Sequence, residues 1–321
     1  MDKKSEHNKI LNYYLGYSTD QVIRYEASSG GIGTGIIKYL LESGMYGTSM
    51  TFVFNVKECR YEPKLIFDYS EYNNCGSVYQ DTDTIHFIKE HIEEIKNGIV
   101  VTCMPCQVNA IRNILNRNKI KNFIISLCCS GQTTIQGTWL YYKLLGINKI
   151  DVRKMQYRGN GWPAGIRIEL ENGNIITRDN YTFPWTLMHQ SLLYRPKRCI
   201  YCAMKTNPNS DVSLADPWLK EYIENDKIGN TLVICNELGD EIIRKMIEAD
   251  QLVVKIIDRD VYVKSQLGTI EKKEKSNKQK FFNEIIVKMG VETSIYKKIV
   301  SFSVHTLKIH IKFIKVLKKI L

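Results

Sequence analysis

The sequence predicts an α/β fold, with a mixed, largely parallel sheet, flanking helices, an inserted β-hairpin and a basic helical C-terminal tail. Between residues 81 and 146, short apolar segments alternate with segments of helical periodicity, which is typical of parallel strands joined by crossover helices. Residues 165–179 then form two alternating runs around Asn172-Gly173, the pattern of a hairpin. After residue 263 the composition becomes strongly basic.

Each expected element depends on a local signal. β-branched and aromatic residues or short apolar runs predict strands, at 48–56, 99–103, 122–129, 211–215, 231–236 and 251–258. A glycine-rich turn at residue 30 opens a helix that stops at Gly44. Helical periodicity, with capping residues before it and glycines after it, predicts the other helices, over 81–98, 105–118, 133–146, 181–194 and 240–250.

Charge divides the chain into three parts. Fourteen Lys and four Glu lie between Lys264 and Leu321, so this part carries nearly all of the net charge of +11. We therefore expect a division into an α/β domain over 1–263, a charged linker over 264–280 and a basic amphipathic helical tail over 281–321. Because the domain is nearly neutral, its charge does not indicate nucleic-acid binding. Hydrophobic residues make up 44% of the chain, which excludes wholesale disorder.

The sequence also predicts where the protein resides. It has neither an uncharged apolar run long enough to span a membrane nor an apolar signal-peptide core near its start, so we expect a cytoplasmic protein. Within 295–321, a wide apolar face adjoins a strip of lysines. Two interpretations stay open for this segment: attachment to an anionic membrane surface, or docking of a helix onto a partner subunit or this domain.

Cysteines carry the strongest chemical signal. There are nine, an odd number, so a complete disulfide framework is not expected. Cys106 follows a predicted strand and opens a predicted helix, whose positive end should lower the thiol pKa. Cys129 has the same place after the next strand, and parallel strands end at one edge of a sheet. Cys199 and Cys202 have the two-residue spacing with which neighbouring thiolates grip one metal centre.

Four thiolates are the donor set of an iron–sulfur cluster or of tetrahedral zinc. The 93 positions between Cys106 and Cys199 argue against a compact zinc knuckle but leave zinc open. Thiol–disulfide chemistry between Cys103 and Cys106 is a third interpretation. The remaining thiols are expected to be core residues, above all Cys59, Cys75 and Cys235.

The turn Ser28-Ser29-Gly30-Gly31 precedes a helix. Small residues allow a phosphate to approach the backbone, and the helix start offers unpaired N–H groups. The same residues also suit a purely structural helix entry, and spacing alone does not decide between the two. Asp211 and Asp216 flank an apolar strand, and residue type does not decide whether they are caps or site residues.

Taken together, these strings resemble the coenzyme F420 hydrogenase/dehydrogenase beta-subunit family over most of residues 11–240. Their order and spacing carry the resemblance, which includes Arg24…Ser28-Ser29-Gly30-Gly31, Gly76-Ser77-Val78-Tyr79, Pro105-Cys106-Gln107, Cys129-Ser130-Gly131, Tyr157-Arg158…Gly161-Trp162, Arg195-Pro196…Cys199-Ile200-Tyr201-Cys202, Ser210-Asp211…Asp216 and Gly229-Asn230-Thr231-Leu232-Val233.

The resemblance implies an iron–sulfur flavoprotein. Its members bind FAD and a 4Fe–4S cluster, and some pass electrons to coenzyme F420, which makes these three the expected cofactors. Carried over to this sequence, the cluster ligands are Cys106, Cys129, Cys199 and Cys202. The flavin-binding residues are Ser28, Ser29, Gly30, Gly31, Tyr79 and Gln107.

The functional expectation follows from that resemblance. It is an oxidoreductase that passes electrons between the cluster, the flavin and a substrate or deazaflavin coenzyme. No catalytic residue is assigned. Many members carry an N-terminal ferredoxin module that has no counterpart here, so a separate electron-donor protein or subunit is the expected partner. The alternative is a non-catalytic, cysteine-ligated zinc or cluster subunit of a larger redox or glycan-modifying complex.

Overall fold

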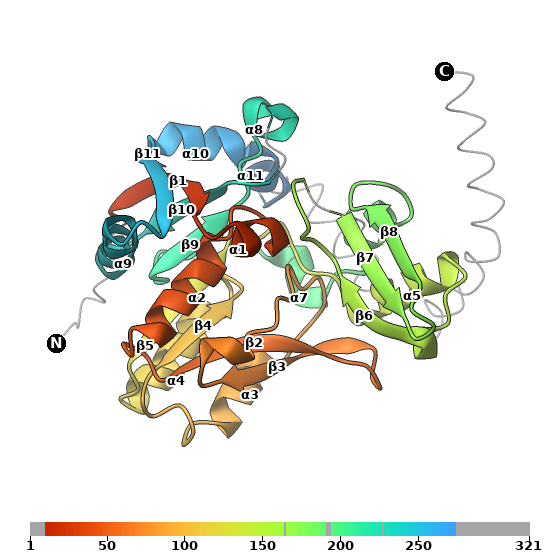
Figure 1. The fold of residues 1–321 in the computed structure, drawn as a ribbon, viewed down its shortest axis with the longest axis horizontal. Coiled ribbons are helices and arrows are strands. Elements are labelled where there is room, and N and C mark those ends of the chain that lie inside the picture. Colours follow the sequence, from red (N-terminus) through yellow and green to blue (C-terminus); the bar gives the residue numbers. More distant parts are fainter. Residues whose placement is uncertain (1–9, 164, 191–193, 226–227, 274–321) are drawn as a thin grey trace.

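The computed structural model describes residues 10–163, 165–190, 194–225 and 228–273, which form two sheets with helices around them (Figure 1). The strands of the large sheet lie in the order β11 (Leu252–Ile256), β1 (Asn12–Ser18), β10 (Thr231–Cys235), β9 (Val212–Ala215), β5 (Asn122–Leu127), β4 (Ile99–Cys103), β2 (Thr48–Asn55) and β3 (Arg60–Ile66). The small sheet has the order β6 (Val152–Gln156), β7 (Gly165–Leu170) and β8 (Ile175–Asp179).

The large sheet is mixed, as the sequence predicts. Its centre is parallel, because β2 pairs with β4, β4 with β5 and β5 with β9 in the same direction. Its four other pairings are antiparallel and lie toward the two edges. Strand β1, which the sequence analysis does not predict, lies inside the sheet between β10 and β11. The fold is therefore α/β with a parallel centre and antiparallel margins.

Helices lie around both sheets. They are α1 (Gln21–Glu26), α2 (Ile32–Glu42), α3 (Thr84–Glu90), α4 (Val108–Arg117), α5 (Ile135–Leu144), α6 (Trp185–Gln190), α7 (Lys197–Tyr201), α8 (Lys220–Asn225), α9 (Glu237–Glu248), α10 (Arg259–Ser265) and α11 (Leu267–Lys273), with short 3-10 turns at Tyr69–Glu71 and Lys149–Asp151.

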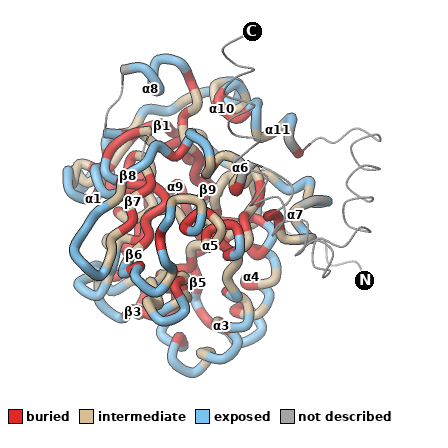
Figure 2. The backbone as a smooth tube through the Cα atoms, turned by 90° about the vertical axis from the view of Figure 1, so that its right-hand side faces the viewer, coloured by how far each residue is buried: buried red, intermediate tan, exposed pale blue. Residues whose placement is uncertain are grey.

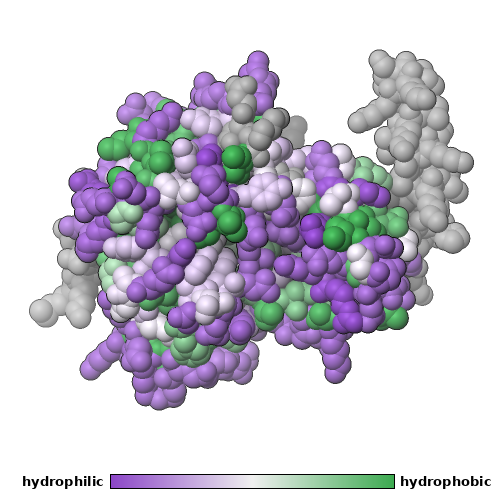
Figure 3. Space-filling view, in the orientation of Figure 1, coloured by the Kyte–Doolittle hydropathy of each residue, from purple (hydrophilic) through white to green (hydrophobic). Residues whose placement is uncertain are grey.

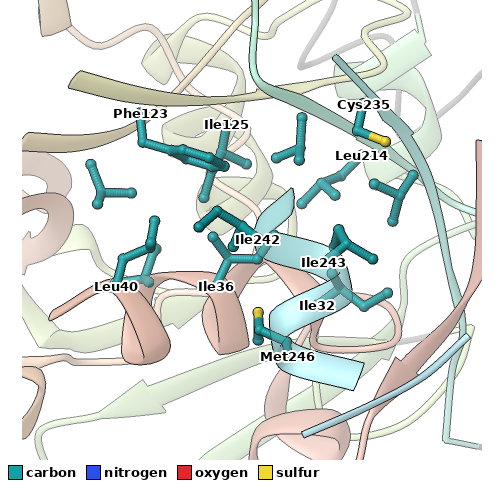
Figure 4. Close-up of a cluster of buried hydrophobic side chains, with 14 of the residues drawn as sticks. Ile32, Ile36, Leu40, Phe123, Ile125, Leu214, Cys235, Ile242, Ile243 and Met246 are labelled. Carbon is teal, nitrogen blue, oxygen red and sulfur yellow. The ribbon is translucent and has the colours of Figure 1, made fainter. Parts of the chain in front are cut away.

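Helices α2 and α9 pack side by side on one face of the sheet. Ile36 of α2 and Ile243 of α9 are fully buried and point toward the sheet residues Phe123 and Ile125 (Figure 4). The opposite face carries α3 and α4 over β4 and β5, and α10 over β1, β9 and β10. Within β5, Ile124 points to that second face, whereas Phe123 and Ile125 point to the first. Because both faces of the strand are buried in apolar cores, its sequence is a continuous run of apolar residues.

The predicted hairpin at 165–179 is present as β7 and β8, and β6 extends it to three antiparallel strands. Trp185 of α6 and Tyr141 of α5 are buried against this small sheet. Buried residues run through the central strands of the large sheet, whereas α8 and the edge strand β8 are mostly exposed (Figure 2). The hairpin thus belongs to a second, smaller core beside the large sheet.

Two predicted segments differ from what the structure shows. The helix expected over 81–98 ends at Glu90, and turns follow up to Gly98. The charged linker expected over 264–280 is helical in its described part, where α10 ends and α11 follows. Apolar residues explain this, because Tyr262 of α10 is buried against the sheet and holds the start of the segment. The amphipathic tail over 281–321 lies outside the described residues and stays a prediction.

Polar residues cover most of the visible surface, with scattered hydrophobic groups, one of them near the small sheet (Figure 3). In the part of the chain that the structure describes, no helix combines the length and the hydrophobicity needed to cross a bilayer.

A buried carboxylate ties α9 to β1. Asp240 accepts hydrogen bonds from Tyr14 Oη at 2.6 Å, Asn12 Nδ2 at 2.7 Å and Arg244 Nε at 2.7 Å. Burial alone would raise the pKa of Asp240, but these three donors lower it below its ordinary value. The same contact and its own burial raise the pKa of Tyr14 to about 12.

Replacing Asp240 should therefore destabilise the fold in a pH-dependent way. We expect Asp240→Asn to lower the free energy of unfolding by about 1–2 kcal/mol at pH 7, since the buried donors lose a charged acceptor. Because the folded-state pKa is lowered, the stabilisation is present above the unfolded-state pKa and disappears as the pH falls through the folded-state pKa. Urea unfolding at pH 7 and below pH 4 measures the difference. Glu241→Gln, an exposed change on the same helix, is the control and should have little effect at either pH. A constant difference across this range would contradict the assignment.

Candidate functional site

Six strands have one end at the same edge of the large sheet. The parallel strands β2, β4, β5 and β9 end there. Strand β10 is antiparallel to β9 and β1 is antiparallel to β10, so β10 starts and β1 ends at the same edge. The turn at 28–31 follows β1, Cys106 follows β4 and Cys129 follows β5. The topology therefore brings these distant segments together, as the sequence predicts for Cys106 and Cys129.

A cavity of about 530 Å³ opens at this edge. Its volume falls within the range of roughly 300–1,000 Å³ that is usual for cofactor and small-molecule sites. Five of the six residues predicted to bind the flavin line it, namely Ser28, Ser29, Gly31, Tyr79 and Gln107.

Gly30, the sixth predicted residue, has a packing role. It does not line the cavity, and a Cβ there would lie 2.7 Å from the Gly16 carbonyl oxygen and 2.8 Å from the Thr231 nitrogen. Its own N–H donates to Thr231 Oγ1 at 2.8 Å. Gly31 is the N-cap of α2 and has a φ of 79°, a conformation that favours glycine. The two glycines thus allow the turn to pack closely against β1 and β10 and to start helix α2 at the cavity wall.

A buried arginine links the small sheet to the large sheet at the cavity. Arg158 donates to Asp216 Oδ2 at 2.7 Å and to the Ser28 carbonyl oxygen at 2.7 Å. Although burial opposes the charge, Asp216 and the hydroxyls of Tyr79 and Tyr181 raise the pKa of Arg158 well above its ordinary value. Its Nε is buried and has no hydrogen-bond partner among the described residues. Arg158 lines the cavity and is therefore a fixed cation in its wall, which suits an anionic ligand.

Aromatic rings form another wall of the cavity. The Tyr79 ring lies 4.3 Å from the His189 ring, measured between centroids, and His189 Nδ1 lies 3.1 Å from Thr133 Oγ1. Tyr181 and Trp218 also line the space and contact each other edge to face. The cavity thus combines small residues at a helix start, a buried cation and flat aromatic surfaces, which are the features that bind a planar ring carrying anionic groups.

A second, smaller cavity is lined by Cys106, Cys129, Cys199 and Cys202, and by no other cysteine of the described chain. Backbone contacts hold its walls together. The Cys129 N–H donates to the Lys205 carbonyl oxygen at 2.9 Å, and Asn207 Nδ2 donates to the Pro105 carbonyl oxygen at 2.9 Å. The loop that follows Cys202 is thereby fixed beside the strand ends that carry Cys106 and Cys129.

The two cavities share a wall. Cys129, Met104, Gln107, Gln132 and Thr82 line both of them. Gln107 is buried, and its Oε1 accepts a hydrogen bond from the Met104 N–H at 3.0 Å, which closes the turn that carries Cys106. A group held by the four cysteines would therefore adjoin a ligand in the large cavity.

The sequence predicts a lowered pKa for Cys106, and this prediction is wrong in direction. The helix start should lower it, but burial and the neighbouring Cys202 and Cys199 raise the Cys106 pKa above its ordinary value, and Arg198 offsets them only in part. Helix α4 begins two residues later, at Val108, so Cys106 lies outside its first turn. Burial likewise raises the pKa of Cys129, against the opposing charge of Lys273.

The other cysteines behave as core residues. Cys103 is buried among the apolar residues under α4, and burial raises its pKa strongly. It lines the large cavity but not the cysteine cavity. This placement does not favour a thiol–disulfide pair of Cys103 with Cys106. Burial also raises the pKa values of Cys59 and Cys75 to about 11 and of Cys235 to about 12.

The donor set of the small cavity fits a metal centre that is held by four thiolates. In the described part of the chain, no three Cys, His, Asp or Glu side chains are already gathered closely enough to hold a metal ion. The four thiols would therefore turn inward when a centre is bound. Four positive side chains that the sequence analysis does not assign lie around these cavities, and they are Arg158, Arg195, Arg198 and Lys273.

Comparison with known families agrees with this geometry. The N-terminal profile of the coenzyme F420 hydrogenase/dehydrogenase beta subunit matches residues 13–86, and the C-terminal profile matches residues 96–260. The chain belongs to this family. Its matched part includes the 28–31 turn, all four cysteines of the small cavity, Arg158 and Asp216, whereas α11 follows it.

Individual relatives cover most of the chain. The beta subunit of coenzyme F420 hydrogenase from Methanococcus voltae is 25% identical over 285 residues, which are 84% of this chain and 91% of the relative. That from Methanothermobacter thermautotrophicus is 26% identical over 299 residues, 86% of this chain and 95% of the relative. Among solved structures, a chain of the F420-reducing [NiFe] hydrogenase complex from Methanosarcina barkeri matches with a TM-score of 0.63 and 20% identity, over 85% of this chain and 93% of that chain. These relatives are subunits of an oxidoreductase.

The Arg158–Asp216 pair should be strongly coupled. Arg158→Met leaves the Asp216 carboxylate without its buried partner, and we expect it to lower the free energy of unfolding by about 3 kcal/mol. Asp216→Asn leaves the arginine uncompensated and should cost a similar amount. The double variant removes both charges, so its cost should fall short of the sum by more than about 1 kcal/mol. Denaturant unfolding of the four proteins measures this coupling. Additive costs would show that the two side chains do not depend on each other.

Proposed function

We propose that this chain is an oxidoreductase subunit that holds a 4Fe–4S cluster on Cys106, Cys129, Cys199 and Cys202 and FAD in the large cavity. One observation carries the proposal: the four cysteines line one cavity, and that cavity shares a wall with a larger one suited to a planar, anionic cofactor. A cluster moves single electrons and a flavin also moves pairs, so the two together couple a one-electron partner to a two-electron substrate.

Each part of the large cavity would take a different part of the flavin. The start of α2, with Gly31 and Thr34 in its wall, would face the phosphates. Arg158 would present its positive charge to an anionic group. Tyr79 and His189 would present flat surfaces to the ring. Coenzyme F420, which appears in the names of the relatives, is the candidate substrate.

Partners are part of the proposal. The relatives are named as subunits of a hydrogenase, and the solved structure is a complex. We infer that this chain receives electrons from a separate protein or subunit. The cytoplasmic location and the membrane attachment through 295–321 stay predictions, and the latter lies outside the described residues.

The cluster assignment is tested by single cysteine replacements. Cys106→Ser, Cys129→Ser, Cys199→Ser and Cys202→Ser should each remove most of the protein-bound iron, because each deletes one thiolate ligand. Cys103→Ser and Cys128→Ser are matched controls that border the same region, and they should keep the iron. Iron and sulfide analysis after anaerobic purification measures the outcome. Iron lost from the controls and kept in the first four would refute the ligand set, and zinc in place of iron would favour the non-catalytic alternative.

The flavin assignment is tested by filling the cavity. Thr34 lies in the first turn of α2 and lines the cavity, so Thr34→Trp should weaken flavin binding at least tenfold by occupying the space for the phosphates. Glu42→Trp, at the exposed far end of the same helix, should bind flavin like the unaltered protein. Flavin fluorescence titration and circular dichroism measure binding and folding. Unchanged flavin affinity in a folded Thr34→Trp protein would place the flavin elsewhere.

A further inference from the structure

The family match ends at residue 260, in the first turn of α10, yet the rest of α10 and α11 close both cavities. Ser265, Gln266, Gly268 and Thr269 line the large cavity, and Lys273 lines the cysteine cavity. Gln266 Nε2 donates to the Asp216 carbonyl oxygen at 2.6 Å, which fixes the junction of the two helices at the end of β9. Helices α10 and α11 are thus fixed to the site by direct contacts.

Lys273 is buried at the end of this segment. Its residue is 5% exposed, although it lies in a charged run that composition alone assigns to a solvated linker. Within the described residues, no carboxylate pairs with its ammonium and no hydrogen bond to it is found. A buried lysine without an anionic partner is unfavourable. Such a position therefore indicates that something negative belongs beside it.

The cysteine cavity supplies that negative charge. Burial raises the pKa values of Cys129 and Cys128 above the ordinary thiol value, and the positive charge of Lys273 opposes this effect in part. Four thiolates around a cluster carry four negative charges. Of the other charged groups that line the cavity, Arg198 is exposed, and Asp81 is engaged as an acceptor of the Ile135 N–H at 2.8 Å. Lys273 is therefore the buried cation in the lining of the cysteine cavity, whereas Arg195, which is also buried, lines only the large cavity.

We propose that Lys273 is the counter-charge of the four-cysteine site, which stabilises the thiolate-bound cluster and raises its reduction potential. This inference rests on the proposed function. Adding an electron makes the cluster more negative, so a fixed cation nearby favours the reduced form, and the field of Lys273 is weakly screened because this side chain is itself buried. The segment that follows the family-matched part of this chain thus sets the potential at which the cluster accepts an electron.

The test compares three variants of the full chain. Lys273→Gln removes the charge, Lys273→Arg keeps it, and Lys264→Gln removes the same charge from an exposed position on α10. The cluster is titrated anaerobically with dithionite and redox mediators and followed by electron paramagnetic resonance. We expect the ratio of reduced to oxidised cluster at a fixed potential to fall about tenfold in Lys273→Gln, equivalent to about 59 mV for one electron. The other two variants should stay close to the unaltered protein.

Iron content separates the possible outcomes. If Lys273→Gln loses its iron while Lys273→Arg keeps iron and potential, the charge is needed for assembly and the proposal is supported. Equal potentials in Lys273→Gln and the unaltered protein would overturn it, as would loss of iron from both Lys273 variants, which would indicate packing rather than charge. An unaltered protein without iron would instead refute the proposed function itself, and this inference with it.

Discussion

Strands β4 and β5 run in parallel, so Cys103 pairs with Ser126 and the loops that carry Cys106 and Cys129 leave the sheet at the same edge. The rest of the site depends on this constraint. Strand β9 continues the parallel order and delivers Asp216 to that edge, and the reversal at β10 and β1 delivers the 28–31 turn. A hairpin pairing of β4 with β5 would have sent the two cysteines to opposite edges. The parallel centre therefore determines where a metal centre and a second cofactor can meet.

Buried positive charge is the second constraint on this edge. Arg158 binds Asp216 and the carbonyl oxygen of Ser28, and it links the small sheet to the turn before α2. Lys273 lines the cysteine cavity. Such charges are costly in a protein interior unless anionic groups accompany them. Their positions around two adjoining cavities are consistent with cofactors that bring negative charge, namely a thiolate-bound cluster and a flavin with its phosphates.

Much of this arrangement is predictable from local sequence, and the exceptions have physical reasons. The alternation of strands and helices from 81 to 146 and the hairpin around Asn172-Gly173 depend on nearby residues, and both are present. Strand β1 escapes prediction because its partners β10 and β11 lie more than two hundred positions away, and because Gly16 weakens its pattern. A Cβ at Gly16 would lie 2.0 Å from the Val253 carbonyl oxygen, so close strand packing requires the glycine.

The candidate site likewise contains residues that local sequence predicts and residues that it does not. Spacing and strand ends point to Cys106, Cys129, Cys199 and Cys202, because the thiol is a rare group with distinct chemistry. Asp211 and Asp216 look alike in the sequence, but Asp211 binds Arg112 and the Ile124 N–H within the sheet, whereas Asp216 faces the cavity. Arg158 and Lys273 have no local signal, since their burial depends on elements distant in the chain. The raised pKa of Cys106 likewise reflects burial and neighbouring thiols that only the tertiary structure brings together.

The central claim is that two adjoining cavities hold a cluster and a flavin in one chain. Its most direct test is iron, sulfide and flavin analysis of the full chain, purified without oxygen, together with its absorbance spectrum. The account predicts a yellow-brown protein with about four iron and four sulfide for each flavin. A colourless protein that contains zinc or no metal, or one that binds flavin but no iron, would contradict it.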